Sequence, residues 1–591
     1  MINMRLTFFT FLPVALGASQ IKLPPEAAPR ATTRNGTYVG RYLPEFKQDL
    51  FLGIPFARSP RLANPIPWNE TWKGTRSAEW HGSICHGLGS DEELARANVT
   101  GMSEECLNLN IIRPSPETIK NHKGKLPIVV WLYGGGFIDG FGADLNSNLS
   151  YIIQDSVALG TPIMGITLNY RVGFFGFPGG EEIGREGVTN LGLKDQRQAL
   201  LWIQENIAAF NGDPRKVTVW GQSAGSQSIV HQILAYNGSA TTSKLFRQGI
   251  LVSCGASVGN TLTPYRPDPV RGYQAILSKA NCADLACLRR IPISTLWNAT
   301  RVDALSTWRP MIDDDFIASP PTLQLQAGRF PRDISILTGG TNDEGYVFAN
   351  SAPNIETEEE LFGMMTQALS LARNETIQKV LDLYPNSGPL PPYGLPHSAT
   401  PDEDKFCQAV KAAGLPCGAQ YRRLAGIMGD FVFISGRRLL TQKFAEHGMK
   451  AWSYRFDTWP TSFPLDTRRN TRPGFASHGA DYSYWFAWGQ GHNIYGNNPA
   501  VIEASEAHRR LREGMSRMLI AFVFGGDPNK GRVRGFPEWP RYSVDNPRNI
   551  VFNATAEPDA LNVHLEKDTW RKEGMALWWT YPLELDFASP E

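Results

Sequence analysis

The sequence of 591 residues lacks the features that would divide it into separate units or attach it to a large charged partner. It has no internal repeat, low-complexity tract, charge block or Gly/Ser-rich linker, which argues for a single domain. The 58 lysines and arginines nearly balance the 57 aspartates and glutamates and are scattered, so we expect no nucleic-acid partner. A small molecule is the better expectation for a substrate.

Long hydrophobic runs are also missing beyond the first residues. An apolar run at 6–16, followed by small residues at 17–19, is typical of a secretory signal peptide and is too short to span a bilayer. We therefore expect a signal peptide at residues 1–19 and one catalytic domain at 20–591. No later segment approaches a membrane-spanning length and the C-terminus lacks the apolar tail of a GPI signal, so we expect a secreted, extracellular protein with no stable membrane anchor.

Cysteine is scarce, and the grouping of the seven residues suits an oxidising compartment. Three pairs are close enough in sequence to close small loops, although spacing does not prove connectivity. These pairs are Cys85 with Cys106, Cys282 with Cys287, and Cys407 with Cys417, and we expect the first two as disulfides. Cys254 is left over and is expected to be a buried, inert thiol.

Sequons for N-glycosylation agree with export. They stand at Asn35, Asn69, Asn98, Asn148, Asn237, Asn298, Asn374 and Asn553.

Short apolar, β-branched runs alternate with segments of helical periodicity along much of the chain. The runs stand at 128–133, 163–168, 217–220, 250–252 and 334–337. Such alternation predicts an α/β fold with a large, mostly parallel central sheet flanked by helices on both faces. In such sheets the chemistry gathers in loops at the carboxyl ends of the strands.

One of these runs leads into the most informative motif of the chain. Residues 217–220 are followed by a Gly-x-Ser-x-Gly motif at 221–225 and then by apolar residues at helical spacing at 226–235. A serine on a tight turn between a strand and a helix is held above the sheet, and glycines flank it because a Cβ there would collide with the strand or the helix. Ser223 is therefore the candidate nucleophile.

The same motif occurs a second time, around Ser257. That copy also follows a predicted strand, but Pro264 and Pro267 prevent a helix after it. Only Ser223 combines strand, turn and helix.

Acyl transfer by a serine also needs donors for the oxyanion of the tetrahedral intermediate. Gly134, Gly135 and Gly136 directly follow the run 128–133, and such a turn lets backbone N–H groups converge on one oxygen. We expect the oxyanion hole at Gly135, Gly136 and the N–H of Ala224.

Six motifs in order along the chain resemble the type-B carboxylesterase and lipase family, which includes cholinesterases and secreted fungal lipases. They lie at 105–111, 134–137, 169–173, 190–196, 210–214 and 221–225. The resemblance starts near Gly36, is strong up to about residue 225 and reaches Trp539. It implies an α/β-hydrolase fold and a serine carboxylesterase that hydrolyses carboxylic esters through an acyl-enzyme, without a metal or other cofactor.

The resemblance also implies the remaining catalytic residues. The family acid lies in a Gly-x-x-x-Asp-Glu-Gly turn, which gives Glu344 here, with Asp343 as its local rival. The family base is a histidine beginning a His-Gly turn, which gives His478, with His492 as the alternative, whereas His231 would face away from Ser223. The expected triad is therefore Ser223, Glu344 and His478.

Some positions depart from the family and bear on the substrate. Gln222 stands where the family commonly has glutamate, and residues 96–98 replace the tryptophan of the cholinesterases, so we do not expect choline esters. The cysteine loop 86–105 is short and acidic, unlike the apolar lid of the related lipases. An aromatic run at 482–488 after His478 favours core packing over a substrate gorge.

Alternatives to a carboxylesterase acting on dissolved esters remain. An interfacial lipase or sterol esterase and an acyltransferase would use the same residues, and a non-catalytic binding relative would have the same fold. The sequence indicates no oligomeric state.

Overall fold

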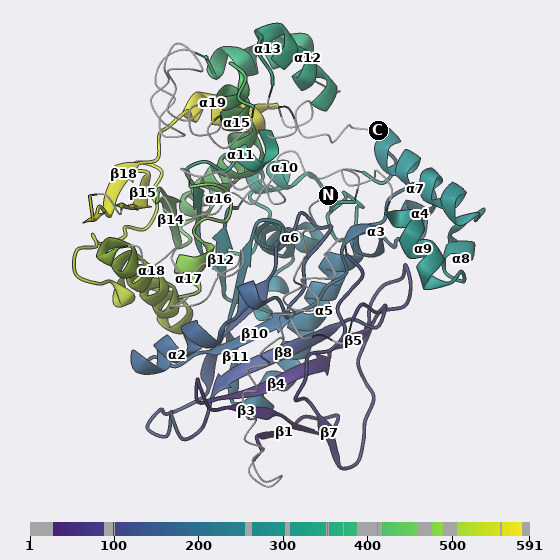
Figure 1. Cartoon of the computed structure of the whole chain (residues 1–591), viewed down its shortest axis with the longest axis vertical. Helices are drawn as coiled ribbons and strands as arrows, with labels where there is room; N and C mark the ends of the chain where they lie inside the picture. Colours follow the sequence, from purple (N-terminus) through teal and green to yellow (C-terminus); the bar gives the residue numbers. More distant parts are fainter. Residues whose placement is uncertain are drawn as a thin grey trace, which may run out of the picture.

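The computed structural model describes residues 28–87, 99, 101–254, 263–301, 308–349, 352, 354–369, 372–386, 411, 416–458, 476–487, 505–555 and 558–581. Within these ranges an 11-stranded sheet forms the centre of the molecule, in the order β18-β15-β14-β13-β12-β11-β9-β10-β8-β4-β3 (Figure 1). In chain order its strands are β3 (Arg41–Leu43), β4 (Gln48–Pro55), β8 (Asn108–Pro114), β9 (Leu126–Leu132), β10 (Met164–Leu168), β11 (Gly212–Gln222), β12 (Gln248–Val252), β13 (Ser335–Thr341), β14 (Ala451–Phe456), β15 (Arg548–Phe552) and β18 (His564–Lys567).

The middle of this sheet is parallel and its edges are antiparallel. Strands β10, β9, β11, β12, β13, β14 and β15 pair in parallel, whereas β18 on one side and β8, β4 and β3 on the other pair antiparallel. All residues of β9, β10 and β12 are buried, as expected for strands covered on both faces. The predicted mostly parallel sheet is confirmed.

Three small sheets lie outside the large one. One joins β1 (Arg30–Thr32), β2 (Thr37–Val39) and β7 (Thr75–Ser77). The other two pair β5 (Ala57–Arg58) with β6 (Ile66–Pro67), and β16 (Ala554–Thr555) with β17 (Ala560–Leu561).

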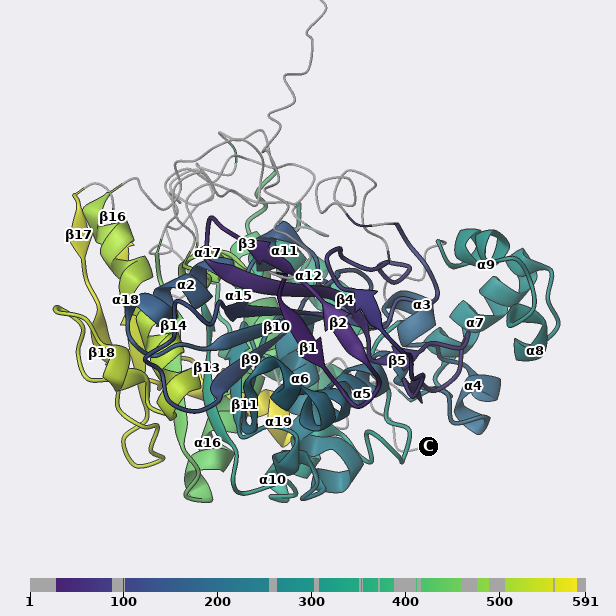
Figure 2. The same ribbon diagram turned by 90° about the horizontal axis from the view of Figure 1, so that it is seen from below.

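Helices cover both faces of the large sheet (Figure 2). On one face α2 (Ser150–Ala158) and α18 (Glu506–Gly525) pack against each other and against the strands. The other face is covered by α5 (Leu191–Asn206), α6 (Ala224–Gly238), α10 (Pro321–Gln326) and α16 (Ser435–Glu446). Further helices surround this core, namely α3 (Gly173–Gly176), α4 (Glu181–Arg185), α7 (Pro267–Ala280), α8 (Leu285–Leu288), α9 (Ile293–Thr300) and α17 (Tyr482–Trp485).

A further group of helices forms a separate layer, which we call the cap. It contains α11 (Tyr346–Ala349), α12 (Glu358–Ala368), α13 (Asn374–Leu383), α15 (Tyr421–Gly429), the π-helix η5 (Asp430–Ile434) and α19 (Lys572–Thr580). These helices gather at the top of Figure 1 and have a hydrophobic cluster of their own, distinct from that of the sheet layers.

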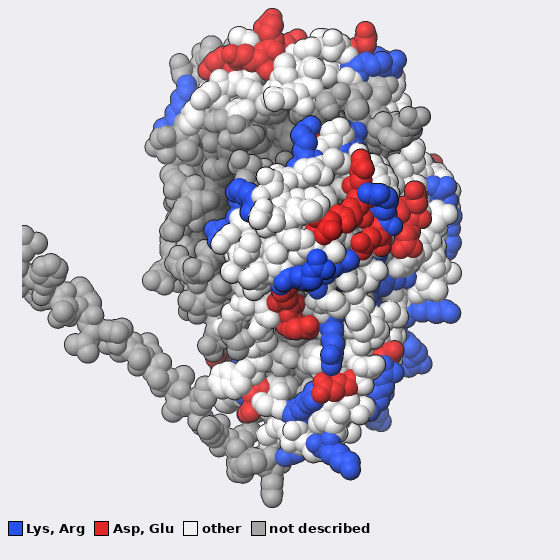
Figure 3. Space-filling model, turned by 90° about the vertical axis from the view of Figure 1, so that its right-hand side faces the viewer, with Lys and Arg blue, Asp and Glu red and all other residues white. Residues whose placement is uncertain are grey.

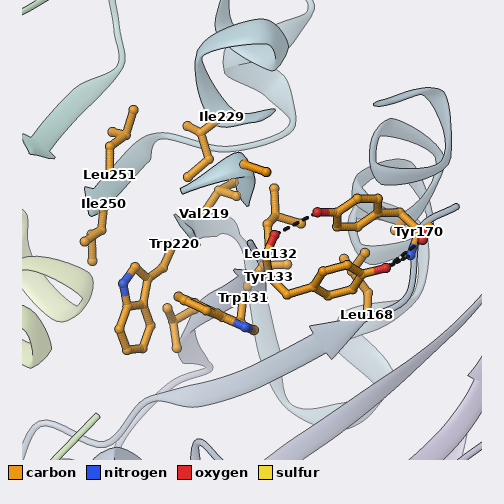
Figure 4. Packing of buried hydrophobic residues seen from close by; sticks show 14 of the residues in the cluster. Trp131, Leu132, Tyr133, Leu168, Tyr170, Val219, Trp220, Ile229, Ile250 and Leu251 are labelled. Carbon is orange, nitrogen blue, oxygen red and sulfur yellow. Dashed lines mark hydrogen bonds between the residues drawn. The ribbon is translucent and has the colours of Figure 1, made fainter. Parts of the chain in front are cut away.

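The core beneath the site is aromatic. The rings of Trp131 and Trp220, on neighbouring strands, are edge to face with centroids 4.8 Å apart (Figure 4). Phe486 stacks on Trp220 at 4.2 Å. Phe486 comes from the aromatic run that follows His478, so this part of the run serves core packing as predicted.

Tyr133 and Tyr170 fix the chain where it leaves β9. Their rings stack at 4.1 Å, the Tyr133 hydroxyl donates to the Tyr170 carbonyl at 2.6 Å, and the Tyr170 hydroxyl donates to the Tyr133 carbonyl at 2.7 Å (Figure 4). Because the glycine run begins at the next residue, Gly134, this reciprocal pair sets the exit direction of the loop that carries the predicted oxyanion hole.

Two of the three cysteine pairs form disulfides, Cys85–Cys106 and Cys282–Cys287, as predicted. Cys254 is free and buried, and burial raises the pKa of its thiol to about 12, which agrees with the expected inert role. Cys407 lies outside the described residues, so the third pairing stays a prediction.

The sequons differ in exposure. Asn69, Asn237, Asn298 and Asn374 are exposed, whereas Asn148 and Asn553 are half-buried and Asn98 lies outside the described residues. Asn35 is buried and its side-chain amide donates to the Glu70 carbonyl at 2.9 Å. A glycan has no room at a buried side chain, so Asn35 is a poor acceptor in the folded protein.

Charges of both signs are interspersed on the face shown in Figure 3, which agrees with the nearly neutral composition. Within the described ranges, no helix has both the length and the hydrophobicity needed to cross a membrane.

Candidate functional site

Ser223 stands on a strained turn between β11 and α6. Its φ and ψ are 54° and −126°, a conformation that costs a residue with a side chain of order 1–3 kcal/mol. The Ser223 N–H donates to the carbonyl of Val252 at 3.0 Å, and the Ser226 hydroxyl donates to the Ser223 carbonyl at 2.7 Å. The backbone of Val252 and the side chain of Ser226 therefore hold the strained residue in place, half-exposed at the carboxyl end of the central strand β11.

Close packing accounts for the glycines of this turn. A Cβ on Gly221 would lie 2.5 Å from the backbone of Gly225, and a Cβ on Gly225 would lie 2.1 Å from the Leu132 carbonyl oxygen. Such distances are far inside van der Waals contact. The predicted strand, turn and helix around Ser223 are confirmed, whereas Ser257 lies outside the described residues.

The loop after β9 brings the second glycine run against this turn. A Cβ on Gly134 would lie 3.1 Å from the Cβ of Ser223 and 2.8 Å from the Gln222 carbonyl. Gly135 and Gly136 have φ of 94° and 63°, which favour glycine. Among the described residues we find no acceptor for the N–H groups of Gly135, Gly136 and Ala224, so these donors are available to a ligand.

His478 and Glu344 form a hydrogen-bonded pair near Gln222, the residue before Ser223. The His478 Nδ1 and the Glu344 Oε2 are 2.5 Å apart. The Glu344 side chain is fully buried, and its second oxygen accepts the Thr341 N–H at 2.7 Å. Glu344 follows the end of β13, while His478 lies between β14 and β15, so segments 134 residues apart meet here.

The other imidazole nitrogen contacts Gln222, a residue outside the predicted triad. The Nε2 of His478 is 3.1 Å from the Nε2 of Gln222, the residue before Ser223, and the Gln222 side chain is buried. Because Glu344 accepts the Nδ1 hydrogen, the Nε2 of the neutral ring has a lone pair that accepts from the amide. The Nε2 contact found in the structure goes to Gln222 and not to Ser223 Oγ.

Two further buried carboxyl groups lie near His478. Asp343, the rival of Glu344, accepts the Ala476 N–H at 3.2 Å and pairs its backbone with the histidine loop, so it holds the loop and not the ring. Burial raises the pKa of Asp343 to about 8. Burial likewise raises the pKa of Asp481 to about 6, although a hydrogen bond from the Tyr454 hydroxyl at 2.7 Å opposes this shift.

Aromatic rings from the cap complete the surroundings of the imidazole. The Phe433 ring stacks on His478 at 4.6 Å, and the Phe348 ring meets it edge-on at 6.1 Å. Phe433 is placed by the π-helix η5, whose wider turn was not predicted.

A cavity of about 340 Å³ opens between the sheet layers and the cap, with Ser223 in its wall. Its volume falls in the usual range for small-molecule sites. The glycine turn and α6 provide one wall, and the cap provides apolar side chains for the other. The lining residues that belong to the cap are Phe348, Met365, Leu369, Ile427, Met428, Phe431, Val432, Phe433 and Trp578.

The other histidines considered above do not take part. His231 is buried on α6, and burial lowers its pKa to about 4. His492 lies outside the described residues. In the part of the chain that the structure describes, no group of three or more His, Cys, Asp or Glu side chains is arranged to hold a metal.

Comparison with known proteins agrees with the fold. A family model described as carboxylesterase family matches residues 27–571. Lipase 4 of Diutina rugosa is 30% identical over 94% of this chain and 96% of its own length. Secreted lipase 1 of Botryotinia fuckeliana is 32% identical over 84% of each chain.

Solved structures give the same fold. The structure of EstA from Aspergillus niger matches with a TM-score of 0.76 at 22% identity, over 95% of this chain and 100% of that one. The carboxylesterase EST55 from Geobacillus stearothermophilus matches with a TM-score of 0.69 at 25% identity, over 93% and 99%. The fold is that of the α/β-hydrolases, and the chain belongs to the carboxylesterase family and is a carboxylic ester hydrolase.

Proposed function

We propose that the protein is a secreted serine carboxylesterase that forms an acyl-enzyme on Ser223. His478 is the general base, Glu344 orients it, and the N–H groups of Gly135, Gly136 and Ala224 bind the oxyanion. The observation that carries the proposal is the 2.5 Å contact between His478 Nδ1 and buried Glu344, on a ring whose other nitrogen faces the turn of the strained serine.

The chemistry follows from these positions. His478 Nε2 takes the Ser223 hydroxyl proton while the oxygen attacks the ester carbonyl, and the developing negative charge lies against the free N–H donors. His478 returns the proton to the leaving alcohol, and water then repeats the cycle on the acyl-enzyme. The Gln222 amide has to leave Nε2 before that nitrogen can take the serine proton.

An organophosphate label tests the proposal. We expect a covalent adduct on Ser223, and we expect Ser223→Ala to lower kcat for p-nitrophenyl esters by at least about 10⁴-fold with an unchanged fold. An adduct on Ser257, or no adduct on an active preparation, would contradict the assignment.

A second candidate is an interfacial lipase, since the relatives above are named lipases and the cap wall of the cavity is apolar. A series of p-nitrophenyl esters of increasing chain length distinguishes the two. A jump in rate above the solubility limit of the substrate indicates the lipase, whereas saturation below it indicates the carboxylesterase.

Secretion is part of the proposal. Signal-peptide cleavage near Ser19 is supported by the names of relatives such as the secreted lipase of Botryotinia fuckeliana. N-terminal sequencing of the protein from the medium tests it.

A further inference from the structure

A tryptophan from the last described helix lines the cavity at Ser223. Helix α19 begins at Lys572, directly after the residue at which the family match ends. Trp578 of this helix is one of the residues that line the cavity. The family match therefore does not account for this part of the wall, and nothing in the proposed proton transfers uses Trp578.

Buried hydrogen bonds hold Trp578 in place. The side chain is fully buried, and its indole N–H donates to the Tyr384 hydroxyl at 3.2 Å. That hydroxyl donates to Asp430 at 2.8 Å, and Asp430 also accepts from Arg571 at the start of α19 at 2.7 Å. Because turning the ring away would leave buried polar groups without partners, the indole is a fixed part of the wall.

Trp578 bounds the cavity on the side of the cap. Its ring packs against that of Phe431 with centroids 4.7 Å apart, whereas the ring that stacks on His478 is Phe433. Helix α19 lies with the other cap helices in Figure 1. The glycine turn and α6, which carry the reacting groups, form the opposite wall. A substrate chain that extends from Ser223 into the cap therefore approaches Trp578.

The cap wall suits an alkyl chain. Its lining side chains are aliphatic, aromatic or methionine, and Met365 and Leu369 of α12 are buried. The polar lining residues Ser223, Gln227 and Arg309 lie outside the cap. Burial of chain carbons against the cap is favourable because it removes apolar surface from water. At about 30 Å³ for each chain carbon, close to the volume of a liquid water molecule, a cavity of about 340 Å³ holds on the order of ten carbons.

We propose that Trp578 limits the length of the alkyl chain that this cavity accepts. The protein then prefers esters with an unbranched chain of up to on the order of ten carbons in the acyl or the alcohol part. Each methylene that enters the cavity raises kcat/KM by about fourfold, and carbons beyond the fixed indole add nothing. The inference rests on the proposed function, because it assumes that the ester reacts at Ser223 in this cavity.

Two series of esters, each measured below its solubility limit, test the inference. The p-nitrophenyl esters from acetate to tetradecanoate vary the acyl chain, and the n-alkyl acetates from methyl to tetradecyl vary the alcohol. In one series we expect kcat/KM to rise with chain length and then to stop rising near ten carbons. The responding series shows which part of the ester faces Trp578.

Substitution of Trp578 should move this break. We expect Trp578→Leu to shift it to chains about two or more carbons longer, and to raise the ratio of kcat/KM, tetradecyl over octyl chain, by about tenfold. Trp578→Phe keeps a ring of smaller size and should give a smaller shift. It also keeps the inference testable if Trp578→Leu does not fold.

The matched control is Trp579→Leu, the same substitution at the next position of α19. Trp579 is half-buried and is not among the described residues that line the cavity. We expect its ratio to equal that of the wild type. Thermal unfolding of each variant measures stability separately, so a lower Tm with an unchanged ratio would show that Trp578 is only a structural residue and would overturn the inference.

A wild type without a break in either series, or a break that is the same in every folded Trp578 variant, would also overturn the inference. An equal shift in Trp579→Leu would do the same. Retained turnover in Ser223→Ala would instead overturn the proposed function. Binding of n-alkanols then tests the length limit by itself, since 1-octanol should raise the Tm of the wild type and 1-tetradecanol should raise only that of Trp578→Leu.

Discussion

The residue before Ser223, the proposed nucleophile, contacts the imidazole of His478. Gln222 contacts His478 Nε2 with a neutral amide, Glu344 bonds the ring, and Asp343 and Asp481 are further carboxyl groups nearby among the described residues. Burial raises the pKa of Asp343 to about 8, so it is largely protonated at neutral pH. The charge at position 222 therefore influences when the imidazole is neutral and able to act as a base.

We expect Gln222→Glu to move the acid limb of kcat/KM to higher pH by about 1–3 units, because a carboxylate at this distance stabilises the protonated imidazole. A pH–rate profile with a neutral p-nitrophenyl ester measures the shift. Gln378→Glu on the exposed side of α13 adds the same charge far from the site and should leave the profile unchanged. An unshifted limb in Gln222→Glu would show that the contact has no electrostatic role.

Asp343 makes the stability of the protein depend on pH. Its pKa is about 8 when folded and near 3.8 when unfolded, so the folded state holds the proton more tightly. The stabilisation is complete below pH 3.8 and is lost as pH rises towards 8. We expect the Tm of the wild type to fall between pH 5 and pH 8 by more than that of Asp343→Asn, as thermal unfolding at the two pH values would show. Parallel Tm values in the two proteins would contradict this titration.

At the scale of elements, the glycine turn after β9 depends on backbone that no other residue adopts easily. A Cβ on Gly135 would lie 2.4 Å from the Asp139 carbonyl oxygen, at a φ of 94°. We expect Gly135→Ala to lower kcat by about 10²–10³-fold, because the turn must open and its N–H moves away from the oxyanion. Steady-state kinetics measures the loss.

Gly363 on α12 is the matched control. A Cβ there meets nothing within 4 Å, so Gly363→Ala should leave kcat unchanged and stabilise the helix by about 0.5–1 kcal/mol. Wild-type kcat in Gly135→Ala would remove this turn from the oxyanion hole.

Local sequence predicted the elements but not every contact between them. The strand at 217–220 and the glycines of both turns could be predicted from patterns of neighbouring residues. In the structure they form β11 and two sharp turns. The pairing of His478 with Glu344 came from family resemblance, since no local pattern links positions 134 residues apart. The Gln222 contact depends on long-range packing and could not be predicted.

At the scale of the whole molecule, a buried ion pair ties the cap together. The Arg571 guanidinium donates to both oxygens of Asp430 at 2.7 Å each, and the Tyr384 hydroxyl donates to Asp430 at 2.8 Å. These residues come from the start of α19, from η5 and from the end of α13. The bonds therefore join three parts of the cap that are distant in sequence.

We expect Asp430→Ala to destabilise the cap by about 3–5 kcal/mol, because Arg571 is left with an uncompensated buried charge. Hydrogen exchange followed by mass spectrometry should show faster exchange in 374–383 and 421–434 and unchanged exchange in β9 and β11. Gln378→Ala, on the exposed side of α13 and bonded to Asp382 of the same helix, is the control. Equal loss of protection in cap and sheet would show that the two hydrophobic clusters unfold as one.

Most of the cap is inserted between β13 and β14, two strands that are neighbours and parallel in the sheet. A crossover connection at the surface can grow or shrink without changing strand order. The turn at Ser223, the proposed nucleophile, and the glycine run come from earlier connections and are constrained by close backbone packing. Natural variation in this one insertion can therefore diversify which molecules are admitted while the reaction machinery is inherited intact.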